Sequence, residues 1–208
     1  MTKAIAAPHD VDAHNDPYLA DFERARDLLQ GPDWRRGLEE LEGLAHRGSI
    51  MSMLLVSGCM LEGWGYDQDL PGAEAWYRVA AESGSARGFF GLGLAHQRMG
   101  RFREAIDDLE VAVSKGYPPA YNALAYIYSR GGDGIPIDQR RALNLWRAGC
   151  SFGHLEAKHG MVRALVHGYA GIRGRVEGFL RVFPLAVELV RAKREAIPIG
   201  SGDYHRVR

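Results

Sequence analysis

Histidine and acidic side chains gather near the start of the sequence, where they could in principle bind a metal ion. His9, Asp10, Asp12, His14 and Asp16 all have metal-capable side chains. However, this segment has no core of its own that could hold a coordination geometry. We therefore expect no defined metal site here and no metal cofactor.

A second chemically capable group consists of His159, Arg163 and His167, which fall within one predicted helix. The two histidines are eight residues apart, about two helical turns, which is too far for a shared pair of metal ligands. Together with the arginine they could act on an anionic substrate. Only Glu156 lies nearby as an acidic partner, and nothing evident fixes a histidine tautomer. We expect no catalytic residues, and an enzyme or enzyme subunit acting on an anionic substrate is the alternative hypothesis.

The sequence contains no GxSxG, CxxC, Walker or Rossmann motif. The GLG stretch at 91–93 lies inside a helical pattern and favours a close helix crossing. Trp76, Tyr77 and Trp146 could form a platform for a sugar or a base, but we predict that they pack between helices. We expect no cofactor of any kind.

Glycine recurs with spacings of 36, 32 and 37 residues, at Gly48, Gly84, Gly116 and Gly153. The residues fifteen positions upstream of these glycines are Asp33, Asp69, Arg101 and Asp138. Aspartate before an apolar-periodic run is a good helix N-cap, and glycine after the run suits the left-handed conformation. Each segment therefore predicts one helix, with Arg101 as the exception at the cap.

A second helix is predicted after each glycine. The residues four positions on are small, namely Ser52, Gly88, Ala120 and Ala157. The residues eight positions on are apolar, namely Val56, Leu92, Leu124 and Met161. Because these positions share one helical face, each unit reads as a pair of closely packed helices.

These units resemble a known repeat family. The stretches GAEAWYRVAAESG (72–84) and AYNALAYIYSRGGDGIPIDQRRALNLWRAGCSFG (120–153) resemble SEL-one-like repeats, and MGRFREAIDDLEVAVSKGYPPAY (99–121) is similar to a tetratricopeptide repeat. The resemblance covers about residues 33–170. It implies an all-α fold, a right-handed α-solenoid of stacked antiparallel helical pairs. It also implies a scaffold or adaptor in protein complexes, often bacterial.

We divide the chain into four parts. Residues 1–16 are expected to form a flexible tail, 17–175 a solenoid of about four helical-pair units, 176–197 capping helices and 198–208 a flexible tail. The apolar faces within 176–197 leave three alternatives open. They could cover the open end of the solenoid, lie on an anionic membrane, or dock on a second copy to make a homodimer.

By similarity with the tetratricopeptide pattern, the first helix of each unit lines a concave groove. The side chains that we expect to bind a partner there are Arg87, Phe90, Arg98, Asn122, Tyr126, Arg130, His159, Arg163 and His167. Arginine forks and an asparagine suit a peptide carboxylate or acidic side chains. The predicted function is therefore a non-catalytic scaffold that binds a protein or peptide partner, and the arginines favour a partner with acidic groups.

Composition narrows the class of partner. The chain has 26 basic and 26 acidic residues, so we expect no nucleic-acid binding. Residues 1–157 carry 16 basic and 22 acidic side chains, whereas 158–208 carry 10 basic and 4 acidic, which could steer an acidic partner to the carboxy-terminal end. Two cysteines, Cys59 and Cys150, and the lack of an 18-residue apolar stretch favour a cytoplasmic protein without a transmembrane segment.

Overall fold

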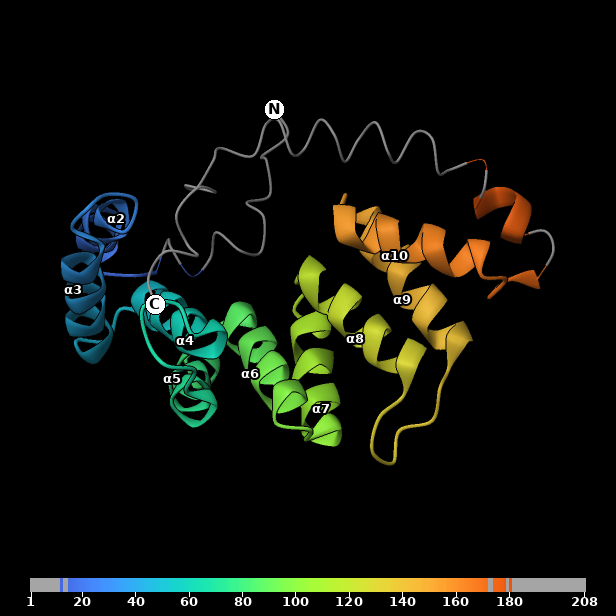
Figure 1. Cartoon of the computed structure of the whole chain (residues 1–208), viewed down its shortest axis with the longest axis horizontal. Helices are drawn as coiled ribbons and strands as arrows, with labels where there is room; N and C mark the ends of the chain where they lie inside the picture. Colours follow the sequence, from blue (N-terminus) through green and yellow to red (C-terminus); the bar gives the residue numbers. More distant parts are fainter. Residues whose placement is uncertain (1–11, 13–14, 172–173, 179, 181–208) are drawn as a thin grey trace.

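The computed structural model describes residues 12, 15–171, 174–178 and 180, and these residues are built from helices (Figure 1). The named helices are α2 (Leu19–Leu28), α3 (Trp34–His46), α4 (Ile50–Glu62), α5 (Leu70–Glu82), α6 (Ala86–Arg98), α7 (Phe102–Ser114), α8 (Pro118–Arg130), α9 (Gln139–Ser151) and α10 (Leu155–Val166). Across this described part no strand forms, apart from an isolated bridge between Gly132 and Ile135. The predicted all-α fold is confirmed.

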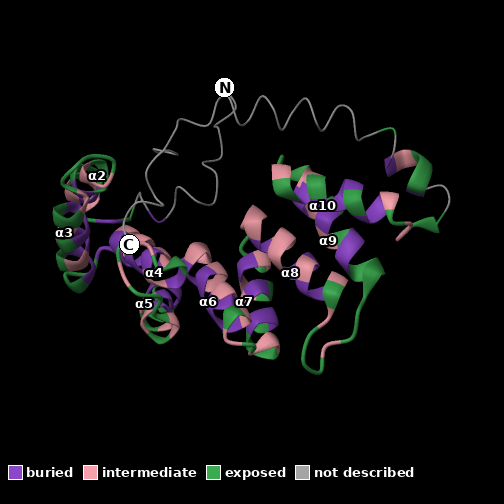
Figure 2. Cartoon of the chain, in the orientation of Figure 1, coloured by how far each residue is buried: buried purple, intermediate pink, exposed green. Residues whose placement is uncertain are grey.

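The helices form a curved array in which each helix packs on the next along the chain (Figure 1). The helices α4, α6, α8 and α10 also contact one another in turn, so they form a continuous row, which we call the inner row. Figure 2 shows that buried residues lie mainly along the seams between adjacent helices. The array is therefore a solenoid of helical pairs. The inner row consists of the helices that directly follow Gly48, Gly84, Gly116 and Gly153.

The predicted helix boundaries follow from local backbone chemistry. The left-handed glycines Gly48, Gly84, Gly116 and Gly153 have φ of 102°, 91°, 73° and 77°. The side chains of Asp69 and Asp138 accept hydrogen bonds from the backbone three residues on, at 2.9 and 2.8 Å. Asp33 is the N-cap residue of α3 as predicted, but its side chain makes no cap hydrogen bond and its ψ of 25° departs from the extended cap geometry.

Two aromatic side chains lie directly on glycines of the neighbouring helix. A Cβ placed on Gly91 would lie 2.1 Å from the Tyr77 ring, and one on Gly160 would lie 2.2 Å from the Trp146 indole. Tyr77 lies seven residues before the left-handed Gly84, and Gly91 lies seven residues after it. Trp146 and Gly160 have the same spacing about Gly153. Tyr77 and Trp146 are buried as predicted, whereas Trp76 is partly buried and packs edge-on to His46.

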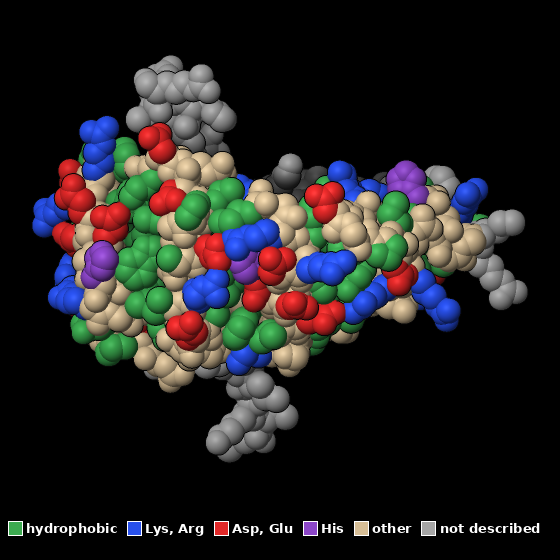
Figure 3. Space-filling view, turned by 90° about the horizontal axis from the view of Figure 1, so that it is seen from below, with side chains coloured by type: hydrophobic (Ala, Val, Ile, Leu, Met, Phe, Trp, Pro, Cys, Tyr) green, Lys and Arg blue, Asp and Glu red, His purple; other side chains and the backbone are tan. Residues whose placement is uncertain are grey.

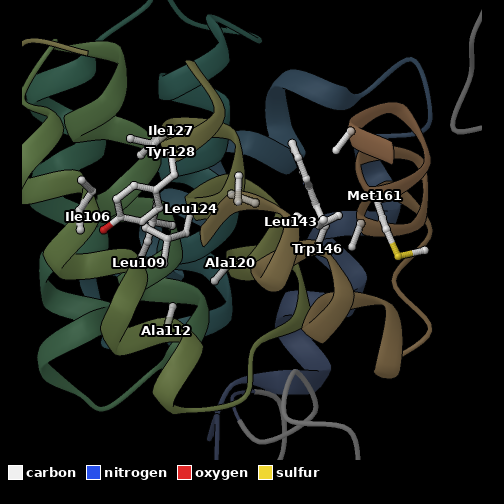
Figure 4. Packing of buried hydrophobic residues seen from close by; sticks show 14 of the residues in the cluster. Ile106, Leu109, Ala112, Ala120, Leu124, Ile127, Tyr128, Leu143, Trp146 and Met161 are labelled. Carbon is white, nitrogen blue, oxygen red and sulfur yellow. The ribbon is translucent and has the colours of Figure 1, made fainter. Parts of the chain in front are cut away.

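The largest core cluster joins α7, α8, α9 and α10 (Figure 4). Leu109 and Leu124 fill the seam between α7 and α8, and Trp146 lies farther along with Leu143 and Met161. Of the predicted capping helices at 176–197, the structure describes residues 176–178 and 180, and the rest lies outside the described residues. Gly178 lies against the end of α10, where a Cβ would meet the Val166 backbone nitrogen at 2.7 Å.

We expect Gly91→Ala to lower the free energy of unfolding by about 1–3 kcal/mol, because the new methyl group must displace the buried Tyr77 ring. The matched control is Gly43→Ala in α3, where a Cβ meets nothing within 4 Å. That variant should be more stable than wild type by up to about 1 kcal/mol, since alanine favours the helix. Urea unfolding measures both, and equal effects of the two substitutions would contradict the packing described here.

Candidate partner-binding groove

Three of the predicted partner-binding side chains line one cavity at the carboxy-terminal ends of α8 and α10. They are Arg130, Arg163 and His167, and the cavity has a volume of about 220 Å³. Its remaining walls come from Ser129, Trp146, Ala164 and Tyr169. Because helix carboxy-terminal ends carry partial negative charge, cations there are favourably placed. We refer to this cavity as the basic pocket.

The cations of the basic pocket have no acidic partner within the described part of the chain. The Arg130 guanidinium lies over the Tyr126 ring, with 4.6 Å between its Cζ atom and the ring centroid. This contact orients the guanidinium without neutralising it. The pocket is therefore a site of uncompensated positive charge.

Two further predicted residues lie at the other end of the groove, near the start of α6. Arg87 contacts Met51, with 3.7 Å between Nη1 and Sδ, and Phe90 packs on Tyr117 with ring centroids 5.2 Å apart. This place also holds Asp12, whose carboxylate interacts with the Arg87 charge. The two ends of the groove are thus chemically different, because only this one has an acidic side chain against it among the described residues.

Asp12 and Asp16 bind the amino-terminal ends of two inner helices. Asp16 Oδ2 accepts hydrogen bonds from Ser49 Oγ and from the Met51 backbone N–H, both at 2.8 Å. Asp12 Oδ2 accepts one from Ser85 Oγ at 2.8 Å. Both aspartates are only 6% exposed. Asp12 and Asp16 fall within the predicted flexible tail at 1–16, yet both are buried against the repeats.

The serines themselves carried a signal that the sequence analysis did not use. Ser49 and Ser85 each follow a left-handed glycine directly, one repeat apart. Each is a helix N-cap, and its side chain accepts from the backbone N–H three residues on, at 3.1 and 3.0 Å. A serine in that place both starts a helix and offers a hydroxyl proton to a carboxylate.

The remaining predicted groove residues lie neither in the basic pocket nor beside Asp12 at the start of α6. Arg98 donates to the Leu61 carbonyl at 3.1 Å and pairs with Glu62 at 2.5 Å, so it ties α6 to the end of α4. Asn122 Oδ1 accepts from Trp146 Nε1 at 2.9 Å, which satisfies the buried indole. His159 is exposed on α10, outside the basic pocket. The single continuous stripe expected from the sequence is therefore divided in the structure.

A partly buried ionic network lies between α5, α6 and α7, and the sequence did not reveal it. His96 is 5% exposed, with Nδ1 2.6 Å from Asp108 Oδ2 and Nε2 3.3 Å from Glu74 Oε1. Arg78 pairs with Glu74 at 2.5 Å, and Arg101 also binds the same carboxylate. Figure 3, viewed from below, shows acidic and basic side chains gathered at the middle of that face. The network holds three helices together.

Hydrogen bonding from Arg101 is the main reason why the pKa of Glu74 falls to about 2, with His96 and Arg78 contributing in the same direction. Burial raises the pKa of Asp108 and raises that of the Cys59 thiol to about 12. A thiol with so high a pKa is a poor nucleophile at neutral pH. Among the described residues no cluster of three metal-binding side chains occurs, and no helix is long and apolar enough to cross a membrane.

Solved structures of helical-repeat proteins are similar to this chain. A Sel1 repeat protein from Oxalobacter formigenes has a TM-score of 0.63 and 21% identity, over 77% of this chain and 69% of that one. A protective antigen of uropathogenic Escherichia coli with an SLR fold has a TM-score of 0.63 and 19% identity. The match covers 82% of this chain and 38% of the antigen.

A putative kinesin light chain from Podospora anserina, with nearly identical TPR-like repeats, has a TM-score of 0.53 and 15% identity over 93% of this chain and 100% of that one. No protein-family model and no curated protein matches the sequence. The fold is therefore that of Sel1-like and tetratricopeptide-like repeat solenoids, as the repeats predicted.

We expect Glu74 to stabilise the folded chain above pH 4.5 and to lose that contribution as the pH falls towards 2. Its pKa is depressed from 4.5 to about 2, so below pH 4.5 the unfolded chain takes up the proton first. The difference in free energy of unfolding between wild type and Glu74→Gln should shrink by about 1–2 kcal/mol from pH 5 to pH 3.

Urea unfolding at the two pH values measures this difference, and Glu82→Gln on the exposed end of α5 is the control. Asp108 contributes with the opposite sign, because its pKa is raised, and it does so in every variant. A Glu74→Gln difference that is the same at both pH values would contradict the ionic network.

Proposed function

We propose that this chain is a non-catalytic protein-interaction scaffold, and that its basic pocket binds acidic groups of a protein or peptide partner. The observation that carries the proposal is the convergence of Arg130, Arg163 and His167 on one cavity without an acidic side chain among the described residues. Solenoids of this fold commonly serve as scaffolds in protein complexes, which supports the same function.

The size and chemistry of the basic pocket suit a carboxylate. Its volume of about 220 Å³ accommodates one side chain or a chain end, and lies below the ~300 Å³ at which small-molecule sites usually begin. Two guanidinium forks can each donate two parallel hydrogen bonds to a carboxylate. The rings of Trp146 and Tyr169, with centroids 6.4 Å apart, supply an apolar wall beside the charges.

The catalytic alternative lacks support from the geometry. Glu156, the acid that the sequence placed nearest to the histidines, lies 3.2 Å from His154 Nε2. It therefore faces a histidine outside the proposed cluster, and no described carboxylate orients His159 or His167 as a general base would require. An enzyme acting on an anionic substrate through these residues is the weaker hypothesis.

The charge distribution along the chain supports an acidic partner. Arg163 and His167 belong to the basic segment 158–208, which can steer a negatively charged segment towards the pocket. Cys59 and Cys150 are not joined in a disulfide bond, which is consistent with the cytoplasm. A homodimer formed through the helices at 176–197 stays a prediction.

We expect Arg130→Glu with Arg163→Glu to weaken binding of the natural partner at least a hundredfold and to leave the fold intact. Reversing two exposed charges at the pocket replaces attraction by repulsion, at a cost of several kcal/mol. The partner is captured on the wild-type chain, identified by mass spectrometry, purified and titrated calorimetrically against each variant.

The matched control is Arg103→Glu with Arg147→Glu, which makes the same charge change on exposed positions of α7 and α9, outside the inner row. This control should bind the partner within threefold of wild type. Equal losses in both double variants would show a long-range charge effect, and a loss in the control alone would place the partner site elsewhere.

A further inference from the structure

Carboxylates occupy the amino-terminal ends of two consecutive inner helices, α4 and α6. The seat on α4 consists of the Ser49 hydroxyl and the Met51 backbone N–H, and it holds Asp16. The seat on α6 is the Ser85 hydroxyl, and it holds Asp12. The two serines are 0% and 3% exposed, so both seats are covered by the carboxylates that fill them.

The spacing of the two seats follows the repeat. Ser49 and Ser85 are 36 residues apart in equivalent places, and the two aspartates that reach them are four residues apart. Asp12 and Asp16 therefore contact two consecutive repeats. Asp12 contacts α6 and Asp16 contacts α4, which is the reverse of the order of the helices along the chain.

The surroundings of the α6 seat favour a negative charge. Arg87 and Lys115 both act on the Asp12 carboxylate, and the start of α6 contributes its positive helix end. Burial nevertheless raises the pKa of Asp12, which shows that its carboxylate gives up hydration to lie there. Hydrogen bonds and charges, groups that another carboxylate can supply equally well, hold the segment in place.

We propose that Asp12 and Asp16 are resident acidic ligands of the groove, and that an acidic segment of a partner protein with two aspartates four residues apart displaces them from the Ser49 and Ser85 seats. The proposal rests on the proposed function, because it assumes that the inner row binds acidic segments. It adds a second recognition site, opposite in position to the basic pocket, which the free chain keeps closed.

The test uses a fluorescent peptide with the sequence of residues 8–18, PHDVDAHNDPY, titrated by anisotropy. The chain with Asp12→Asn and Asp16→Asn should bind this peptide at least tenfold more tightly than wild type does. In wild type the tethered segment competes, since a short linker gives an effective concentration in the millimolar range. A control peptide with asparagine in place of Asp12 and Asp16 should bind at least tenfold more weakly.

Substitutions at the seats separate recognition from general effects. We call the chain with Asp12→Asn and Asp16→Asn the opened chain. In this opened chain, Ser49→Ala with Ser85→Ala should lower peptide affinity at least tenfold. The matched control is Ser83→Ala with Ser114→Ala, two exposed serines whose hydroxyls bond only to carbonyls of their own helices. Arg103→Glu with Arg147→Glu, two exposed positions outside the inner row, should leave this affinity within threefold. The basic pocket is tested separately on the natural partner, so failure of the basic pocket and failure of the seats give different results.

A measurement on the wild-type chain keeps the proposal testable if the aspartate variant does not fold. The Tyr18 amide donates to Asp16 Oδ1, whereas the Met51 amide donates to Asp16 Oδ2 from the seat itself. Excess unlabelled peptide should speed hydrogen exchange at Tyr18 of the labelled chain at least tenfold, while Met51 stays protected by the incoming carboxylate.

Three results would overturn the proposal. One is equal peptide binding by wild type and a folded opened chain, which would mean that residues 12–16 do not compete for the site. Another is a lower melting temperature of the opened chain with no peptide binding, which would mean that Asp12 and Asp16 only stabilise the fold. Unchanged exchange at Tyr18 in excess peptide leads to the same conclusion.

Discussion

The close approach of an aromatic ring to a glycine on the next helix determines how the pairs α5–α6 and α9–α10 are packed. Tyr77 on Gly91 and Trp146 on Gly160 occupy mirrored places on either side of a left-handed glycine. The ring fills the volume that a Cβ would otherwise take, so the two helix axes can come close while the ring is buried. Interiors packed at this density tolerate no added methyl group without a shift of the ring.

The inner-row helices α4, α6, α8 and α10 contact one another in turn, so their ends are aligned along the row. The amino-terminal ends of α4 and α6 present Ser49 and Ser85, and the carboxy-terminal ends of α8 and α10 present Arg130, Arg163 and His167. Helix amino-terminal ends bind carboxylates through hydroxyl and N–H donors, whereas the carboxy-terminal ends collect cations. Both kinds of end therefore favour an acidic ligand, by different means.

The ionic network around His96 differs from the basic pocket in how its charges are compensated. Its carboxylates, imidazole and guanidinium groups neutralise one another within the seam between α5, α6 and α7. The charges of the basic pocket find no such compensation among the described residues. Paired charges stabilise the helix stack, and uncompensated charges are available to a partner.

The sequence by itself determined the repeat, the helix pairs and most of their boundaries. Left-handed glycines and the caps at Asp69 and Asp138 depend on interactions within three or four residues, which a local pattern records. Only the tertiary structure decided which side chains of the expected groove meet. Arg98 and Asn122 turned to partners 36 and 24 residues away, and Asp12 reached a serine 73 residues away. Long polar side chains satisfy themselves with whichever group the stacked helices bring near, and no periodicity in the chain encodes that choice.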